Sequence, residues 1–423
     1  MQATNLRHGV LQALSSSDQI LFSKFGLGTT IEFPFECIHH AFELHARNQP
    51  NSIAVQDMDD KTTYAELDHQ ANSVASHLRK LGVTPDSRVG LVVERSISMV
   101  IGILAILKTG AAYIPLDGND TSNESLNHAL QDSGSTIALI QSRFANRITT
   151  VMTLILEDSI CPHPSSVHCR KPQDLAAGED SACIIYAQDS SYRPKGIDLT
   201  HKNIVNLVCI SPGNLGMCQG LRVSQITNIS SALAVWEILG SLCNGSTLVL
   251  GGTSIREWNL VMKMVDIVIA TPTMLSLYNP AEHRNIKVVA AAGDRNYSQG
   301  LVNIWARFVK FYTCRGHTET TIVSTMQLHS PGRNVGPSKV IPNNSIYILD
   351  EKRQPVEMGG AGIVWIGGVG VSRGYVNLSR LSSLKYRYDP FLNNGMSMFD
   401  TGELARWRPD GSLEYADEGG WQV

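Results

Sequence analysis

The strongest constraint on the fold is an alternation of amphipathic helices with short apolar strands, which begins near residue 35. Thr63 and Glu66 have the spacing of a capping box, in which each side chain accepts a hydrogen bond from a free backbone N–H at the helix start. Apolar residues recur at helical spacing from Leu67 to Leu81, and Gly82 can end this helix because glycine tolerates a positive φ. Strands that alternate with such helices predict a parallel α/β sheet.

The alternation runs through two parts of the chain. In the first part we expect strands and helices over 89–93, 100–108, 111–116, 124–132 and 136–141. In the second part we expect them over 222–227, 233–242, 247–250, 266–270, 286–292, 301–308 and 309–314. Beyond residue 326 the predicted elements are short strands at 345–349, 362–366 and 412–415, with a hairpin turn at 409–411. We therefore expect a leader or linker over 1–33, a first α/β subdomain over 34–180, a second over 181–326, a β-rich subdomain over 327–415 and a truncated hinge over 416–423.

Composition and charge exclude several classes of protein. The net charge of −3 gives no reason to expect nucleic acid or an anionic membrane as a partner. The longest apolar run, 99–107, is too short to span a bilayer, and the N-terminus lacks the basic-then-apolar pattern of a signal peptide. The eight cysteines include no C-x-x-C pair, so we expect reduced thiols in a cytoplasmic protein. The thirteen histidines show no ligand spacing, and we interpret the pair His39–His40 as structural.

The segment 184–208 predicts a buried strand, a polar loop and a helix that Thr200 opens. The loop resembles the phosphate loop of adenylate-forming ligases, most closely that of the adenylation domains of nonribosomal peptide synthetases, which reads YTSGSTGxPKG. Tyr186 and residues 194–196 keep that frame, but Asp189 and Tyr192 stand where the family has glycines. A loop that binds phosphate needs glycine for close backbone approach, so an ordinary surface loop stays open as an alternative.

Further motifs of the same family follow in order along the chain. Residues 63–67 (TYAEL), 107–117 (LKTGAAYIPLD) and 367–375 (GGVGVSRGY) match family motifs, and 211–217 (SPGNLGM) resembles fungal siderophore synthetases. The resemblance implies an α/β fold, the N-terminal core of an adenylate-forming ligase. That core has two α/β sheets with flanking helices and a small β-rich subdomain. The family's small C-terminal subdomain, which carries a lysine that assists adenylation, has no counterpart in the sequence.

The resemblance also implies which residues form the site. ATP and Mg²⁺ would be held by Lys195, Gly293, Thr318, Glu319 and Glu403, with Glu319 as the metal ligand. The substrate pocket would be lined by Ala232, Leu233, Trp236, Ile269, Ala290, Ala292, Cys314, Ile322 and Val323. This almost wholly apolar set suits an uncharged or aromatic–aliphatic group. Two alternatives stay open: Glu319 could be a solvated carboxylate, and the apolar residues could belong to the core.

Several departures fall where the family holds its nucleotide and the α-ammonium of its substrate. Ala232 stands where the family has the aspartate that binds this ammonium, and leaving such a charge unpaired costs roughly 3–5 kcal/mol. Arg315 replaces the aromatic residue that stacks on adenine, although a guanidinium can also lie flat on a base. Glu418 and Gly420 replace the arginine and the aspartate of the hinge motif, unless this acidic turn is plain solvated surface.

Three functions are consistent with these observations. The first, which we favour, is a degenerate adenylation core that forms no aminoacyl adenylate and acts as a binding or scaffold module. The second is an ATP-dependent ligase for a carboxylic acid without a free α-amine, with the C-terminal subdomain supplied in trans. The third is a repurposed biosynthetic enzyme that uses the former substrate pocket without ATP. The partners would be a carrier or condensation domain or a small apolar ligand, and neither nucleic acid nor a membrane.

Overall fold

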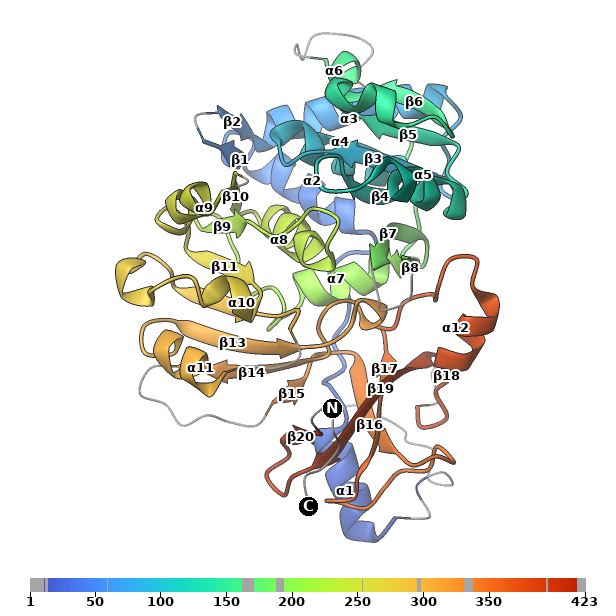
Figure 1. Cartoon of the computed structure of the whole chain (residues 1–423), viewed down its shortest axis with the longest axis vertical. Helices are drawn as coiled ribbons and strands as arrows, with labels where there is room; N and C mark the ends of the chain where they lie inside the picture. Colours follow the sequence, from blue (N-terminus) through green and yellow to red (C-terminus); the bar gives the residue numbers. More distant parts are fainter. Residues whose placement is uncertain are drawn as a thin grey trace.

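The structure, a computed structural model of the 423-residue chain, describes residues 11, 14–58, 60–161, 171–187, 194–252, 254–294, 298–330, 338–392 and 395–416. Asp189 and Tyr192 of the predicted phosphate loop, and Glu418 and Gly420 of the predicted hinge, lie outside these residues. Within the described residues, the strands form three sheets, of which the first two lie side by side and the third lies below them in Figure 1.

The first sheet has six strands in the order β6-β5-β3-β4-β7-β8. Its strands are β3 (Arg88–Val93), β4 (Ala112–Asp117), β5 (Ile137–Ile140), β6 (Met152–Ile155), β7 (Ser181–Ala187) and β8 (Lys195–Thr200). All neighbours in this order are parallel except β7 and β8, which are antiparallel. Helix α3 (Tyr64–Lys80) precedes β3, and the helical segments between the strands are α4 (Ile97–Lys108), α5 (Asn123–Asp132), η2 (Ser142–Arg147) and α6 (Leu156–Ser159).

Local signals set the ends of these helices. The predicted capping box of α3 is confirmed, because the Glu66 backbone N donates to Thr63 Oγ1 at 3.2 Å and the Thr63 backbone N donates to Glu66 Oε2 at 2.8 Å. Gly82 follows α3 with a φ of 88°. Almost every residue of α4 is buried, which agrees with its uninterrupted apolar sequence.

The second sheet has nine strands in the order β15-β14-β13-β12-β11-β9-β10-β1-β2. Its strands are β1 (Ile53–Asp57), β2 (Asp60–Thr63), β9 (Arg222–Gln225), β10 (Thr247–Leu250), β11 (Ile267–Ala270), β12 (Val288–Ala291), β13 (Lys310–Arg315), β14 (Thr325–His329) and β15 (Lys339–Val340). Its helical segments are α2 (Ile38–Asn48), α7 (His201–Cys209), α8 (Ala232–Leu242), α9 (Ile255–Met262), α10 (Pro272–Leu275), η4 (Pro280–Glu282), α11 (Gln299–Trp305) and η5 (Thr318–Thr320). In this order, the strands β13, β12, β11, β9, β10 and β1 are parallel to one another. Strands β2, β14 and β15 run antiparallel to their neighbours.

Helices α2, α4, α7 and α8 lie between the first two sheets (Figure 1). One apolar cluster joins these helices to both sheets, with Leu91 on the first sheet, Ile269 on the second and the fully buried Trp236 on α8. This shared core explains why the two sheets form one body.

The third sheet contains β16 (Asn344–Leu349), β17 (Gly362–Gly368), β18 (Tyr386–Tyr388), β19 (Ser397–Trp407) and β20 (Leu413–Tyr415), with α12 (Ser379–Lys385) preceding β18. Helix α1 (Ser16–Phe25) packs against it, although it falls in the range predicted to be a leader or linker. Phe22 stacks on Tyr347 with ring centroids 5.4 Å apart, and the rings of Phe25 and Trp407 lie 6.3 Å apart. Packing of these aromatic side chains gives α1 a fixed position on the third sheet.

The predicted fold class, two α/β sheets with flanking helices and a smaller β-rich part, is confirmed. Sheet membership nevertheless crosses the predicted subdomain ranges. Strands β1 and β2 come from 34–180 but complete the second sheet, and β7 and β8 come from 181–326 but extend the first. The reason is that β7 pairs with the exposed edge of β4, and β1 with that of β10, over long sequence separations. Such long-range pairing leaves no local trace in the sequence.

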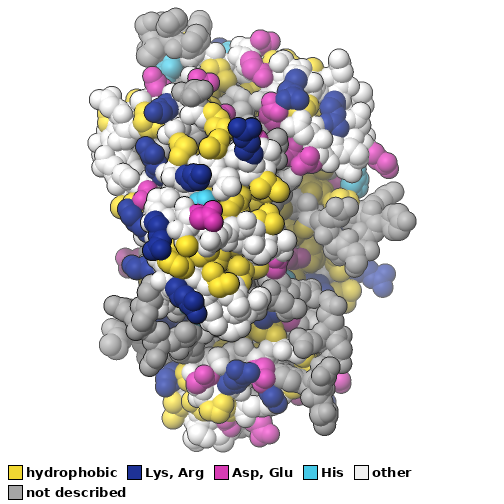
Figure 2. All heavy atoms as spheres, turned by 60° about the vertical axis from the view of Figure 1, so that its left-hand side comes forward, with side chains coloured by type: hydrophobic (Ala, Val, Ile, Leu, Met, Phe, Trp, Pro, Cys, Tyr) yellow, Lys and Arg dark blue, Asp and Glu magenta, His cyan; other side chains and the backbone are white. Residues whose placement is uncertain are grey.

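The surface agrees with the small net charge. On the face shown in Figure 2, basic and acidic side chains are interspersed, and neither sign forms a continuous field. None of the helices in the described part of the chain combines the length and the apolarity that a membrane span requires.

Candidate functional site

A cavity of about 360 Å³ opens where the second sheet meets the third. Its walls come from the start of α8, from the segments that follow β11 and β12, from the end of β13 with the loop behind it, and from β19. The cavity therefore lies at the carboxyl ends of parallel strands, where open α/β sheets usually bind their ligands.

The cavity gathers many residues that the sequence predicted to act together. Its lining includes the predicted nucleotide residues Gly293, Thr318, Glu319 and Glu403 and the predicted pocket residues Ala232, Leu233, Cys314 and Ile322. Ser231, Thr271, Asp294, Arg315, Gly316 and His317 complete the lining. Burial raises the pKa of the Cys314 thiol, so this side chain adds a neutral wall.

The other predicted pocket residues do not line this cavity. Trp236, Ile269, Ala290, Ala292 and Val323 are buried in the core cluster between the sheets. Apolar side chains near strand ends pack equally well against a helix, and here they share one core cluster with residues of α8, Trp236 among them. These five side chains lie in the core, which is the environment that the alternative interpretation of the sequence assigns to them.

Glu403 is held in place by two basic side chains. His317 Nε2 lies 3.3 Å from Glu403 Oε2, and Arg315 Nη2 lies 3.9 Å from Glu403 Oε1. The Arg315 guanidinium in turn stacks on the ring of Tyr415, 3.4 Å from its centroid. Gly402, with a φ of 70°, lies directly before Glu403, where the pairing of β17 with β19 is irregular. Arg315, which departs from the family motif, thus belongs to a connected cluster with Glu403 and Tyr415 at the cavity wall.

Glu319 is linked to the predicted lysine through an aromatic ring. The Tyr375 hydroxyl donates to Glu319 Oε1 at 2.8 Å, and Lys195 Nζ lies 5.9 Å from the centroid of the same ring. Lys195 does not line the cavity, because the ring of Tyr375 lies between Lys195 and the cavity residue Glu319. Among the described residues, Oε2 of Glu319 has no hydrogen bond, so a cation can approach this oxygen.

The loop between β13 and β14 is tightly wound. A Cβ at Gly316 would lie 2.5 Å from the Ile322 carbonyl oxygen, so only glycine fits there. Thr321 and Ile322 adopt left-handed backbone conformations, with φ of 56° and 71°. This winding brings Thr318 and Glu319 back toward the cavity.

Asp294 is a cavity residue that the sequence reasoning missed. Its Oδ2 accepts hydrogen bonds from the backbone N of Thr273 at 3.1 Å and from the Thr273 hydroxyl at 2.9 Å. A usable signal was present, because Gly293 and Asp294 directly follow the buried strand predicted over 286–292. Polar residues after a parallel strand are candidates for ligand contact.

Glu237 fixes helix α8 relative to β9. This fully buried carboxylate accepts hydrogen bonds from Ile226 N at 2.9 Å, from Gln225 Nε2 at 3.1 Å and from both the backbone and the hydroxyl of Thr227. Burial raises the pKa of Glu237 to about 7, even though these donors and the nearby Arg95 favour the charged form. The start of α8, which supplies Ala232 and Leu233 to the cavity, depends on this anchor.

Comparison with known proteins identifies the class. Residues 42–376 match the family described as AMP-binding enzyme, and the chain belongs to this family. It is 46% identical over 408 residues to "Adenylate-forming reductase 03009" of Coprinopsis cinerea, an alignment that covers 96% of this chain and 40% of that relative. The chain thus spans well under half the length of the curated relative that it matches.

Solved structures share the fold. The nonribosomal peptide synthetase FmoA3 superposes with a TM-score of 0.85 at 22% identity, over 97% of this chain and 45% of that chain. The NpsA N-terminal subdomain of Klebsiella oxytoca superposes with a TM-score of 0.81 at 20% identity, over 91% of this chain and 100% of that chain. The resemblance to the N-terminal core of adenylation domains is therefore confirmed.

Proposed function

We propose that this chain activates a carboxylic acid. It binds Mg·ATP in the cavity, where the acid's carboxylate oxygen attacks the α-phosphorus and pyrophosphate leaves. The observation that carries the proposal is the convergence of Thr318, Glu319, Glu403 and Gly293 on one cavity in a member of the AMP-binding enzyme family. Because the relative at 46% identity is named an adenylate-forming reductase, we further propose that the thiol of a carrier domain takes the acyl group from the adenylate, with AMP as the leaving group, and that a hydride donor bound to a further domain then reduces the thioester and releases the thiol.

The proposed roles follow from the chemistry of each side chain. Glu319 suits Mg²⁺, which prefers carboxylate oxygens, and Tyr375 fixes its orientation through the other oxygen. Thr318 offers a hydroxyl and a backbone N–H to phosphate oxygens, and Glu403 offers acceptors to the ribose hydroxyls. Arg315 adds a positive charge to a wall that faces an anionic ligand.

The substrate that we propose lacks a free α-amine. Helix α8 opens with Ala232 and Leu233, which offer no carboxylate to an ammonium group. Asp294, the carboxylate that follows β12, already accepts two hydrogen bonds from Thr273. The NpsA subdomain has been solved in complex with 3-hydroxybenzoyl-AMSN, so this fold accommodates an acyl group without an α-amine.

Binding of stable adenylate analogues tests the proposal without requiring turnover. Thermal unfolding is followed with Mg·ATP and with acyl-sulfamoyladenosines that carry aryl, aliphatic or α-aminoacyl groups. A ligand at 100 times its Kd adds about 2.7 kcal/mol of stability, which a thermal shift detects readily. We expect stabilisation by Mg·ATP and by the aryl or aliphatic analogues, and a weaker Mg·ATP effect in Glu319→Gln than in the exposed control Glu351→Gln.

Two results would contradict parts of this proposal. Stabilisation by the α-aminoacyl analogues alone would refute the substrate class but leave adenylation intact. An absence of any shift with Mg·ATP and with all analogues would refute adenylation itself.

The second candidate is a core that forms no adenylate and acts as a scaffold. The pairing of Glu403 with His317, close to Arg315, favours it, because a carboxylate already held by basic groups is less available to a ribose. The same titrations distinguish the candidates, since a scaffold is not stabilised by nucleotide.

A further inference from the structure

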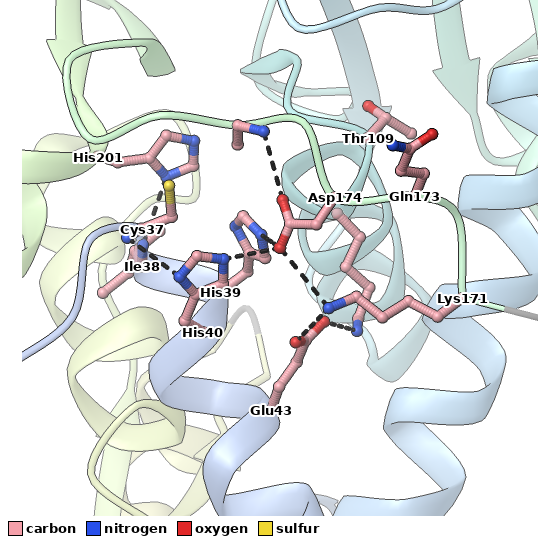
Figure 3. A network of polar contacts seen from close by, with 12 residues as sticks. Cys37, Ile38, His39, His40, Glu43, Thr109, Lys171, Gln173, Asp174 and His201 are labelled. Atoms are coloured by element: carbon pink, nitrogen blue, oxygen red, sulfur yellow. Dashed lines mark hydrogen bonds and ion pairs between the residues drawn. The ribbon is translucent and has the colours of Figure 1, made fainter.

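A cluster of one thiol and two imidazoles lies outside the cavity, between α2, α7 and the segment 171–180. Cys37 precedes α2, His39 lies in its first turn, and His201 is the first residue of α7. One ligand atom from each residue lies within 4.8 Å of the other two, and all three side chains are buried. Figure 3 shows these residues converging from segments that are far apart in sequence.

The hydrogen bonds leave free nitrogen atoms inside the cluster. His39 Nε2 lies 3.3 Å from Asp174 Oδ2 and therefore carries the proton, so His39 Nδ1 holds a lone pair. His39 Nδ1 and His201 Nε2 are both buried without a hydrogen-bond partner among the described residues. His201 Nδ1 accepts a long hydrogen bond of 3.4 Å from the Ile38 backbone N, so the lone pair of this neutral ring lies on Nδ1 and the proton on Nε2. Buried polar atoms rarely stay unpaired, so the unshared lone pair of His39 Nδ1 points to a missing ligand, and His201 can offer the lone pair of its Nδ1.

We propose that Cys37, His39 and His201 form a zinc site, in which Asp174 holds His39 in the ligating orientation. A thiolate with imidazoles is a donor set typical of Zn²⁺. A histidine that binds a metal usually donates its other N–H to a carboxylate, and His39 and Asp174 already have this arrangement. A water molecule completes the tetrahedron.

The local charges and accessibility fit a cation. Acidic side chains surround the thiol, namely Glu36, Asp174 and Asp180. Burial lowers the pKa of His39 and of His201, so both rings are neutral and can donate a lone pair. The Asp174 and His40 side chains, 29% and 30% exposed, give the cluster a route to solvent.

Only a small adjustment is needed for coordination. Zinc bonds of ~2.0–2.3 Å place the ligand atoms of a tetrahedral site roughly 3.3–3.6 Å apart. The present separations, up to 4.8 Å, require a contraction of about 1 Å. Rotation of the Cys37 and His201 side chains supplies such a movement. The bound ion would then join α2, α7 and the segment 171–180.

Metal binding to the purified 423-residue chain tests this site. After chelator treatment, we expect one Zn²⁺ per chain, a rise in the thermal unfolding midpoint, and a thiolate-to-cobalt charge-transfer band when Co²⁺ is used instead. Cys37→Ala should abolish the band and the stoichiometric binding. Cys183→Ala, which removes an equally buried thiol outside the cluster, should keep both.

A second variant keeps the test decisive if Cys37→Ala does not fold. Asp174→Asn alters a partly exposed side chain that contacts the proposed ligand but not the ion, and it should weaken zinc binding about 10–100-fold. Zinc binding that Cys37→Ala or Asp174→Asn leaves unchanged would overturn the proposal. So would a cobalt band that disappears in Cys218→Ala, because that thiol is exposed and lies outside the cluster.

Discussion

The buried carboxylate of Glu237 gives the fold a defined dependence on pH. Its pKa is about 7 in the folded protein and 4.5 for the ordinary group. Between these values the folded protein binds the proton more tightly than the unfolded chain. Lowering the pH through this range therefore stabilises the fold, and raising the pH through 7 removes that stability. At 1.36 kcal/mol per pKa unit, the full change is about 3 kcal/mol.

The substitution Glu237→Gln removes this titration and leaves a side chain of nearly the same size. The free energy of unfolding is measured from urea titrations at about pH 7.5 and about pH 5, followed by tryptophan fluorescence. We expect the difference in stability between wild type and variant to grow by about 2–3 kcal/mol toward the lower pH. The control Glu351→Gln, at an exposed turn, should follow the wild-type profile. Parallel profiles for Glu237→Gln and wild type would refute the reasoning.

Three further substitutions test the packing, each by the free energy of unfolding in urea. Gly316→Ala places a methyl group 2.5 Å from a backbone carbonyl oxygen and should cost roughly 1–3 kcal/mol. The control Gly300→Ala, whose methyl group would meet only the Ser298 hydroxyl at 3.3 Å, should cost less, and equal effects would contradict this. Lys108→Met leaves two carboxylates without their buried partner and should cost about 3–5 kcal/mol. The exposed control Lys80→Met should cost less than about 0.5 kcal/mol. An unchanged free energy of unfolding in Lys108→Met would show that the ion pair adds nothing. Thr63→Ala removes the cap of α3 and should cost about 1 kcal/mol, so an unchanged stability would mean that the capping bonds add no net stability.

The parts of the fold that follow from local rules were predictable from the sequence. Thr63 and Thr200 open α3 and α7 as expected, because a cap is decided within four residues. The apolar stretch of α4 and the positive φ of Gly110 at its end follow from the same short-range physics. Pairing of β7 with β4, and of β1 with β10, depends on which sheet edges meet in space, so periodicity could not assign it.

The residues of the candidate site could be predicted only where family motifs follow one another in the expected order along the sequence. Thr318, Glu319 and Glu403 meet at one cavity, although Glu403 lies on a different sheet. Trp236 and Ile269 could not be assigned to cavity or core, because an apolar side chain on a helix or in a strand has the same pattern in both environments. The proposed zinc ligands could not be predicted from the sequence for a different reason. His201 follows Cys37 by more than a hundred residues, so no spacing rule connects them.

The docking of α1 on the third sheet has a consequence for synthesis of the protein. The apolar face of this helix is synthesised several hundred residues before the ring of Trp407, which packs against Phe25. At about 5–20 residues per second, the ribosome needs roughly 20–80 s to bridge that gap. Throughout this interval the aromatic side chains of the nascent helix stay uncovered, and they offer a binding site to chaperones until the sheet arrives.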